Sequence, residues 1–69
     1  MHIDVTIITR DVNGNRSGHY FAWDEACEFI PEHITAEDEI LVVMAGEVPL
    51  YSSLGNDPIT IDDLIGFFA

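Results

Sequence analysis

Residues 3–23 read IDVTIITRDVNGNRSGHYFAW, and this stretch decides the fold. Residues 3–9 are rich in β-branched side chains that nearly alternate with polar ones, which is typical of a strand. Residues 17–23 have the composition of a second strand. Between them stands Asn13-Gly14, the preferred pair for a two-residue type I′ turn. The stretch therefore predicts an antiparallel hairpin.

A two-residue turn at Asn13-Gly14 would also set the register of the hairpin. Ile7 would then lie opposite Tyr20, and Asp11 would lie opposite Arg16 as a cross-strand ion pair. Both faces of this hairpin would be partly apolar. Either each face is covered, or one displays aromatic side chains to a partner. Because so short a chain has few elements with which to cover both faces, we expect partial cover.

Residues 23–30 follow the hairpin and have the pattern of a short helix. Its acids gather at the N-terminal end, where the helix dipole favours negative charge. Pro31 is predicted to end the helix, since proline lacks the N–H that continues it. Ala26, Phe29 and Ile30 are expected to face the sheet.

Residues 36–45 fit two structures. Thr35 and Asp38 have the spacing of a helix capping box, and Gly46 would suit a helix C-terminus. The run Ile40–Met44 is instead short, apolar and β-branched, as in a buried strand. We predict a central strand over 39–45 and keep the helix as the alternative.

The C-terminal third predicts one more helix. A short extended piece around Leu50 and Tyr51 is followed by a turn cluster at 55–58. Thr60 can then cap a helix with Asp63 at the capping-box position. Residues 1–69 thus form one compact α+β domain. It has a small, mainly antiparallel sheet, built from the N-terminal hairpin and a central strand, with one or two short helices.

Size and composition favour a folded cytoplasmic domain. The chain has 69 residues, of which 48% are hydrophobic, so it can build a core. No apolar run approaches the roughly 20 residues that span a bilayer. The N-terminus lacks the features of a signal peptide. A single cysteine, Cys27, cannot form an internal disulfide, which is consistent with a reducing compartment.

Little in the sequence points to catalysis or to a metal. His2, His19 and His33 never fall at ligand spacing, and Cys27 stands alone. Residues 11–15 faintly resemble the start of a calcium loop, but the glycine and the final acid do not fit. We expect no catalytic residues, no cofactor and no metal, and therefore no enzyme.

Charge is the most unusual property of the chain. Thirteen acids stand against two arginines and no lysine, which gives a net charge of −11. After Ser17 there are eleven acids and no Lys or Arg. Such a surface disfavours direct binding to nucleic acid or to an anionic membrane. It favours a basic protein partner, and the candidate binding acids fall in three clusters: Asp24, Glu25, Glu28 and Glu32; Glu37, Asp38 and Glu39; and Asp62 and Asp63.

In size, charge and hairpin-plus-helix organisation the chain resembles the small acidic proteins with which phages disarm host nucleic-acid enzymes. These include anti-CRISPR proteins, anti-restriction proteins and uracil-DNA glycosylase inhibitors. The resemblance rests on overall character, so it assigns no functional residue. It implies an inhibitor that mimics DNA and blocks the basic groove of a CRISPR effector complex or a nuclease.

A second interpretation makes the acidity incidental, as in organisms whose proteins are acidic in general. The chain would then be an interaction or regulatory module that binds through aromatic side chains, namely Phe21, Trp23, Tyr51, Phe67 and Phe68. The sequence leaves open the partner, the source, and whether the chain is a monomer or a homodimer. It also leaves open whether the acidic clusters share one face.

Overall fold

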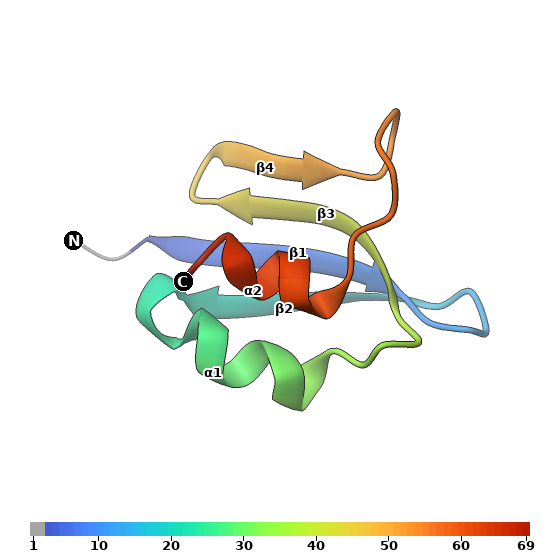
Figure 1. Cartoon of the computed structure of the whole chain (residues 1–69), viewed down its shortest axis with the longest axis horizontal. Helices are drawn as coiled ribbons and strands as arrows, with labels where there is room; N and C mark the ends of the chain where they lie inside the picture. The colour runs from blue at the N-terminus through green and yellow to red at the C-terminus, as the bar shows by residue number, and fades with distance from the viewer. Residues whose placement is uncertain (1–2) are drawn as a thin grey trace.

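The computed structural model describes residues 3–69 as two layers, a sheet and a pair of helices (Figure 1). The antiparallel sheet has four strands in the order β2-β1-β3-β4. The predicted α+β architecture is confirmed. The elements in chain order are β1 (Asp4–Arg10), β2 (Arg16–Ala22), α1 (Trp23–His33), β3 (Glu39–Ala45), β4 (Val48–Ser52) and α2 (Ile61–Gly66).

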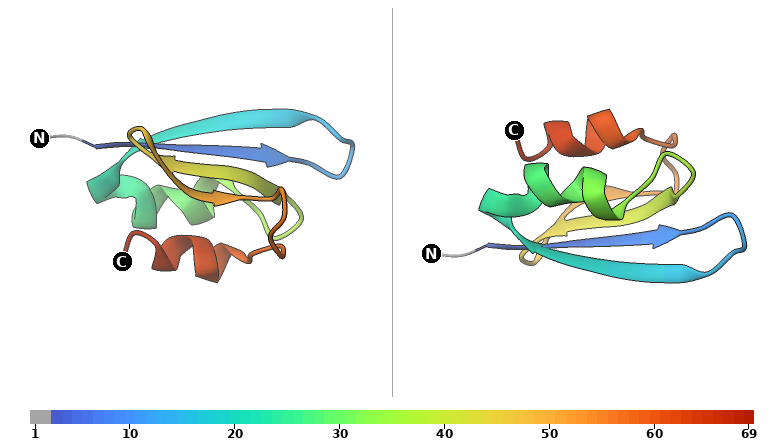
Figure 2. Two further views of the ribbon diagram at one scale, coloured as in Figure 1. Left: turned by 90° about the horizontal axis from the view of Figure 1, so that it is seen from above. Right: turned by 90° about the horizontal axis from the view of Figure 1, so that it is seen from below.

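Both helices cover the same face of the sheet, as the two edge-on views show (Figure 2). Side chains on a strand point alternately to opposite faces. In β1 the buried side chains are Val5, Ile7 and Thr9, so these face the helices. They pack with Ile30 of α1 and Leu64 of α2, both fully buried. Within residues 3–69, no helix covers the other face of the sheet (Figure 2).

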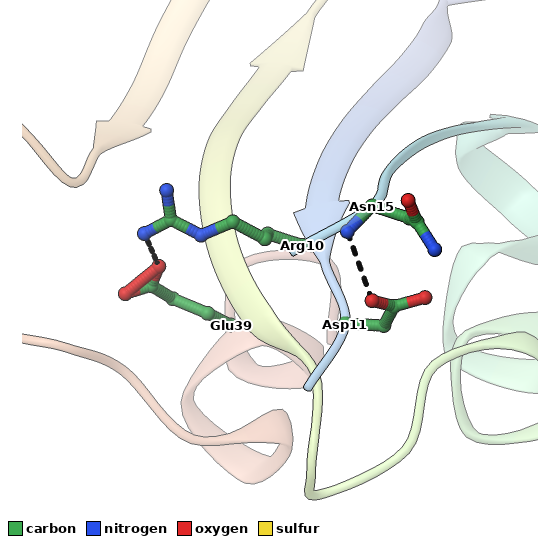
Figure 3. Close-up of polar contacts among 4 residues, drawn as sticks. All are labelled: Arg10, Asp11, Asn15 and Glu39. Atoms are coloured by element: carbon green, nitrogen blue, oxygen red, sulfur yellow. Dashed lines mark hydrogen bonds and ion pairs between the residues drawn. The ribbon is translucent and has the colours of Figure 1, made fainter. Parts of the chain in front are cut away.

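The β1–β2 turn is longer than the two residues predicted. The Gly14 N–H donates to the Asp11 carbonyl at 3.0 Å, and the Asp11 N–H donates to the Asn15 carbonyl at 2.9 Å. Gly14 has a φ of 86°, in the left-handed region. The Asp11 carboxylate also accepts a hydrogen bond from the backbone N–H of Asn13. It accepts a second from the backbone N–H of Asn15 (Figure 3). This is a three-residue loop in which a left-handed glycine follows a turn.

The longer loop shifts the hairpin by one residue, so the predicted register is wrong. Ile7 pairs with His19 rather than with Tyr20. A slip of one residue exchanges the two faces of a strand. Tyr20 therefore lies on the uncovered face and is 72% exposed.

The predicted ion pair between Asp11 and Arg16 is also wrong. Arg16 lies opposite Arg10, a like-charge pair that is unfavourable across strands. The Arg10 guanidinium instead donates to the Glu39 carboxylate at the start of β3 (Figure 3). Glu39 thus compensates the charge of Arg10, not that of Arg16.

The central segment is a strand, as predicted, and β3 has the expected bounds. Thr35 and Asp38 have capping-box spacing, but the contacts between them close a turn before β3. The Asp38 carboxylate accepts from the Thr35 N–H at 3.0 Å, and the Asp38 N–H donates to the Thr35 carbonyl at 3.1 Å. The same spacing at Thr60 and Asp63 does begin a helix, and both hydrogen bonds of that capping box form.

The predicted end of the first helix is wrong, because α1 continues through Pro31 to His33. Proline removes one hydrogen bond, but it does not stop the next turn here. The Ile34 N–H donates to the Ile30 carbonyl at 2.9 Å. Ile34 is buried in the core, so its packing holds the last turn in place.

We predict that Gly14→Ala will destabilise the protein by about 1 kcal/mol, because a side chain disfavours the left-handed conformation. Chemical denaturation monitored by circular dichroism would measure the change in free energy of unfolding. Val12→Ala, in the same loop and exposed, is the control and should change it little. Equal stability of Gly14→Ala and wild type would contradict the loop geometry.

Candidate acidic interface

The outer side of α1 carries a continuous stripe of acids. Ala26 and Ile30 face the sheet and are fully buried, whereas Asp24, Glu25 and Glu28 are exposed. Together with Glu32, these acids fall within about 100° of the helix circumference at 3.6 residues per turn. Neighbours three or four residues apart lie about 5–6 Å from one another at Cβ. The stripe therefore runs along the helix directly away from the core.

α2 adds two acids to the same layer. Ile61, Leu64 and Ile65 pack on the core, so Asp62 and Asp63 lie on the opposite side of this short helix and are exposed. The two helices are in contact, and the Cys27 thiol lies 3.8 Å from the Ile65 carbonyl. We define the acidic helix layer as Asp24, Glu25, Glu28, Glu32, Asp62 and Asp63. The fold thus brings two of the three sequence clusters to one face.

The three acids of the third sequence cluster, Glu37, Asp38 and Glu39, have different surroundings. Glu37 is exposed in the loop that follows α1, a few residues after Glu32 in the sequence. Asp38 uses its carboxylate to hold the turn at Thr35. Glu39 lies on β3 in the ion pair with Arg10, so its charge is compensated. Of these three acids, only Glu37 has no such structural contact in the described part of the chain.

Positive charge lies in the sheet. Arg10 and Arg16 are the chain's two basic residues other than histidine, and they lie at paired positions of β1 and β2. Alternation places both on the uncovered sheet face, with Ile8, Val42 and Met44. No lysine or arginine occurs in either helix. The helix layer and the sheet face therefore differ in charge, which the sequence could not show.

Thr9, His19 and Cys27 make side-chain contacts within the fold. Thr9 Oγ1 and His19 Nε2 are hydrogen-bonded at 3.0 Å, but Thr9 is only 2% exposed, so its hydroxyl is out of reach of a substrate. Cys27 is half-buried between the helices. Residues 3–69 contain no group of three or more potential ligands that could hold a metal ion. His2 lies outside the described residues.

The aromatic side chains proposed for the alternative interface do not form one exposed surface. Tyr51 and Phe68 are buried, at 9% and 6% exposed. Trp23 packs edge-on against Phe68, with ring centroids 4.8 Å apart, and Phe21 packs against the core. Phe67 is 37% exposed. The strongly exposed aromatic ring is Tyr20, whose position the sequence register had misplaced.

Comparison with known proteins gives this surface no precedent. No known family model matches the chain, and no curated protein or solved structure is significantly similar to it. Within residues 3–69, neither helix has the length and apolarity needed to cross a bilayer.

We predict that His19 titrates below the ordinary histidine value of 6.5. Partial burial lowers the pKa of His19, the nearby Asp38 carboxylate opposes this effect, and His33 adds to it. As the pH falls below 6.5, the unfolded chain takes up a proton before the folded one does, so His19 makes the fold less stable there. An NMR titration of the imidazole in the folded and urea-unfolded protein would measure both values. A folded-state pKa at or above the unfolded one would contradict the prediction.

Proposed function

We propose that this protein is an inhibitor whose acidic helix layer binds the basic surface of a nucleic-acid-binding protein in the cytoplasm. The partner is a nuclease or a CRISPR effector complex, and the protein is encoded by a phage. The observation that carries the proposal is the gathering of six carboxylates on the outer face of two packed helices that contain no lysine or arginine.

The spacing of the α1 stripe supports mimicry of a nucleic-acid backbone. From Asp24 to Glu32 the helix axis advances about 12 Å at 1.5 Å per residue. Four charges over that length give one charge about every 4 Å. A single strand of duplex DNA carries one phosphate per about 3.4 Å of helix axis. A groove lined by arginine and lysine would therefore meet a similar linear density of negative charge.

The layer also holds its charges in a fixed arrangement. Both helices pack on the sheet through Ala26, Ile30 and Leu64, each fully buried. A backbone that is ordered before binding loses less conformational entropy than a flexible acidic tail would. The net charge of −11 further speeds the approach to a basic partner, an effect that salt weakens.

We predict that Glu28→Gln combined with Glu32→Gln will weaken capture of the partner, since both exposed side chains belong to the α1 stripe. The tagged protein would be immobilised and exposed to a bacterial lysate, then washed with salt or with duplex DNA. The expected result is capture of a nucleic-acid-binding protein that both washes release. Loss of two charges at a contact surface should lower affinity about tenfold or more, as for truncated charge pairs at interfaces.

The matched control is Glu47→Gln combined with Asp57→Asn. This variant has the same net charge but changes acids in the β3–β4 turn and in the loop before α2. It should capture the partner as wild type does. If both double variants lose capture equally, only overall charge matters and the proposed layer is wrong. A captured partner that resists salt and DNA would reject mimicry altogether.

A further inference from the structure

The outer edge of β2 is an unpaired strand edge with a known hydrogen-bonding register. The Trp23 N–H donates to the Ile3 carbonyl, and the Asp11 N–H donates to the Asn15 carbonyl, each at 2.9 Å. In an antiparallel pair, bonded and non-bonded residue pairs alternate. These two hydrogen bonds mark bonded pairs at the two ends of the hairpin, so the alternation between them is set. Gly18 and Tyr20 then belong to non-bonded pairs, whose backbone groups do not bond to β1. Their N–H and C=O groups therefore point outward, as does the N–H of Ala22.

The two edges of the sheet differ in how well they are protected against further pairing. β4 has five residues, contains Pro49, and has a register irregularity next to it. Short strands, proline and bulges are the usual means of blocking an edge. β2 has seven residues and contains neither proline nor an acid. Only the β2 edge offers a regular row of free donors and acceptors.

A hollow lies beside this edge and is lined by residues from both faces of the sheet. Its lining includes Phe21 of β2 and Phe29 and His33 of α1. The three rings are in contact, with centroids 5.8–6.3 Å apart. Asp4 and Glu25 also line the hollow. An apolar, aromatic wall thus stands next to unpaired backbone, with carboxylates near the same end.

We propose that an extended segment of a basic protein adds to the outer edge of β2 as a fifth strand. Such strand addition gains affinity from main-chain hydrogen bonds and specificity from pockets for alternate side chains. This inference rests on the proposed function for the basic character of the partner. It places a second contact at the sheet edge, which shares only Glu25 with the acidic stripe on the outer side of α1.

The chemistry of the segment follows from the two sides of the edge. On the helix side, alternate residues meet the aromatic wall of Phe21, Phe29 and His33, which suits apolar side chains. On the uncovered side they meet Tyr20 and Asp4, which suits the alkyl stem and charged head of lysine or arginine. A second copy of this chain is the competing occupant of the same edge, and the dependence of amide protection on protein concentration tests for it.

The test uses a synthetic peptide of alternating lysine and valine, seven residues long to match β2 and blocked at both ends. A second peptide of equal charge has proline at its centre and cannot form a regular strand. Each is titrated into the ¹⁵N-labelled protein while amide exchange is followed by NMR. We expect the first peptide to slow exchange of the Gly18 and Tyr20 amides, and the second to leave them unchanged.

Ala22→Pro tests the same edge from the protein side. Ala22 already has a φ of −71°, which suits proline, and its N–H is not used by β1. Removing this donor should weaken peptide binding about tenfold, the usual effect of an unpaired acceptor at an interface. Ala22→Ser keeps the N–H and should bind as wild type does.

Three results would overturn the proposal. The first is equal protection by both peptides or by neither. The second is a folded Ala22→Pro variant that binds normally. The third is protection of Gly18 and Tyr20 in the protein alone that rises with its concentration, which would mean that a second copy covers the edge. If Ala22→Pro does not fold, the comparison of the two peptides on the wild-type protein still tests whether a strand adds to the β2 edge. The Glu28 and Glu32 variants test the acidic layer independently of this edge.

Discussion

The hydrogen bonds of the β1–β2 loop are the constraint on which the rest of the structure depends. The Asp11 carboxylate accepts from two backbone N–H groups, and Gly14 takes the left-handed conformation. Together they make the loop one residue longer than a type I′ turn. The register that results sends Val5 and Ile7 to the helix side. With a one-residue slip, those side chains would pair with residues of the other face, and Tyr20 and Ala22 would replace His19 and Phe21 on the side toward α1.

Once one face of the hairpin is apolar, the position of the helices and of the charge follows. α1 and α2 must both bury their apolar sides, and the face that carries Val5, Ile7, Val43 and Tyr51 is where they do so. Their polar sides then point away from the sheet in the same direction. Because those polar sides contain acids and no lysine or arginine, the layer is uniformly negative. The charge segregation is thus a consequence of packing two amphipathic helices on one sheet face.

The order of the strands has a separate effect on the edges. β1 lies inside the sheet, so the hairpin places β2 at one edge, and the β3–β4 hairpin places β4 at the other. Pro49 and the adjacent register shift make the outer edge of β4 poorly suited to pair with a further strand. β2 remains a regular edge, and α1 leaves it at Trp23 and runs back beneath it. This return places Phe29 and His33 of α1 beside the free backbone.

The sequence by itself determined the element types, because local chemistry specifies them. β-branched alternation produced β1, the capping box at Thr60 produced α2, and the β-branched run at Ile40–Met44 outweighed a helical start at Thr35. The charge imbalance could also be read directly. The end of α1 could not, because the packing of Ile34 in the core holds the turn that Pro31 weakens.

Only the tertiary structure decided how these elements face one another. Asn13-Gly14 suits two kinds of turn, and the hydrogen bonds of Asp11 select between them, so the register lay beyond sequence pattern. The common face of the α1 and α2 acids depends on which sheet face the helices cover. The ion pair of Glu39 with Arg10 and the hollow beside β2 join residues distant in sequence. Such contacts arise from chain topology, whereas local propensity acts over only a few residues.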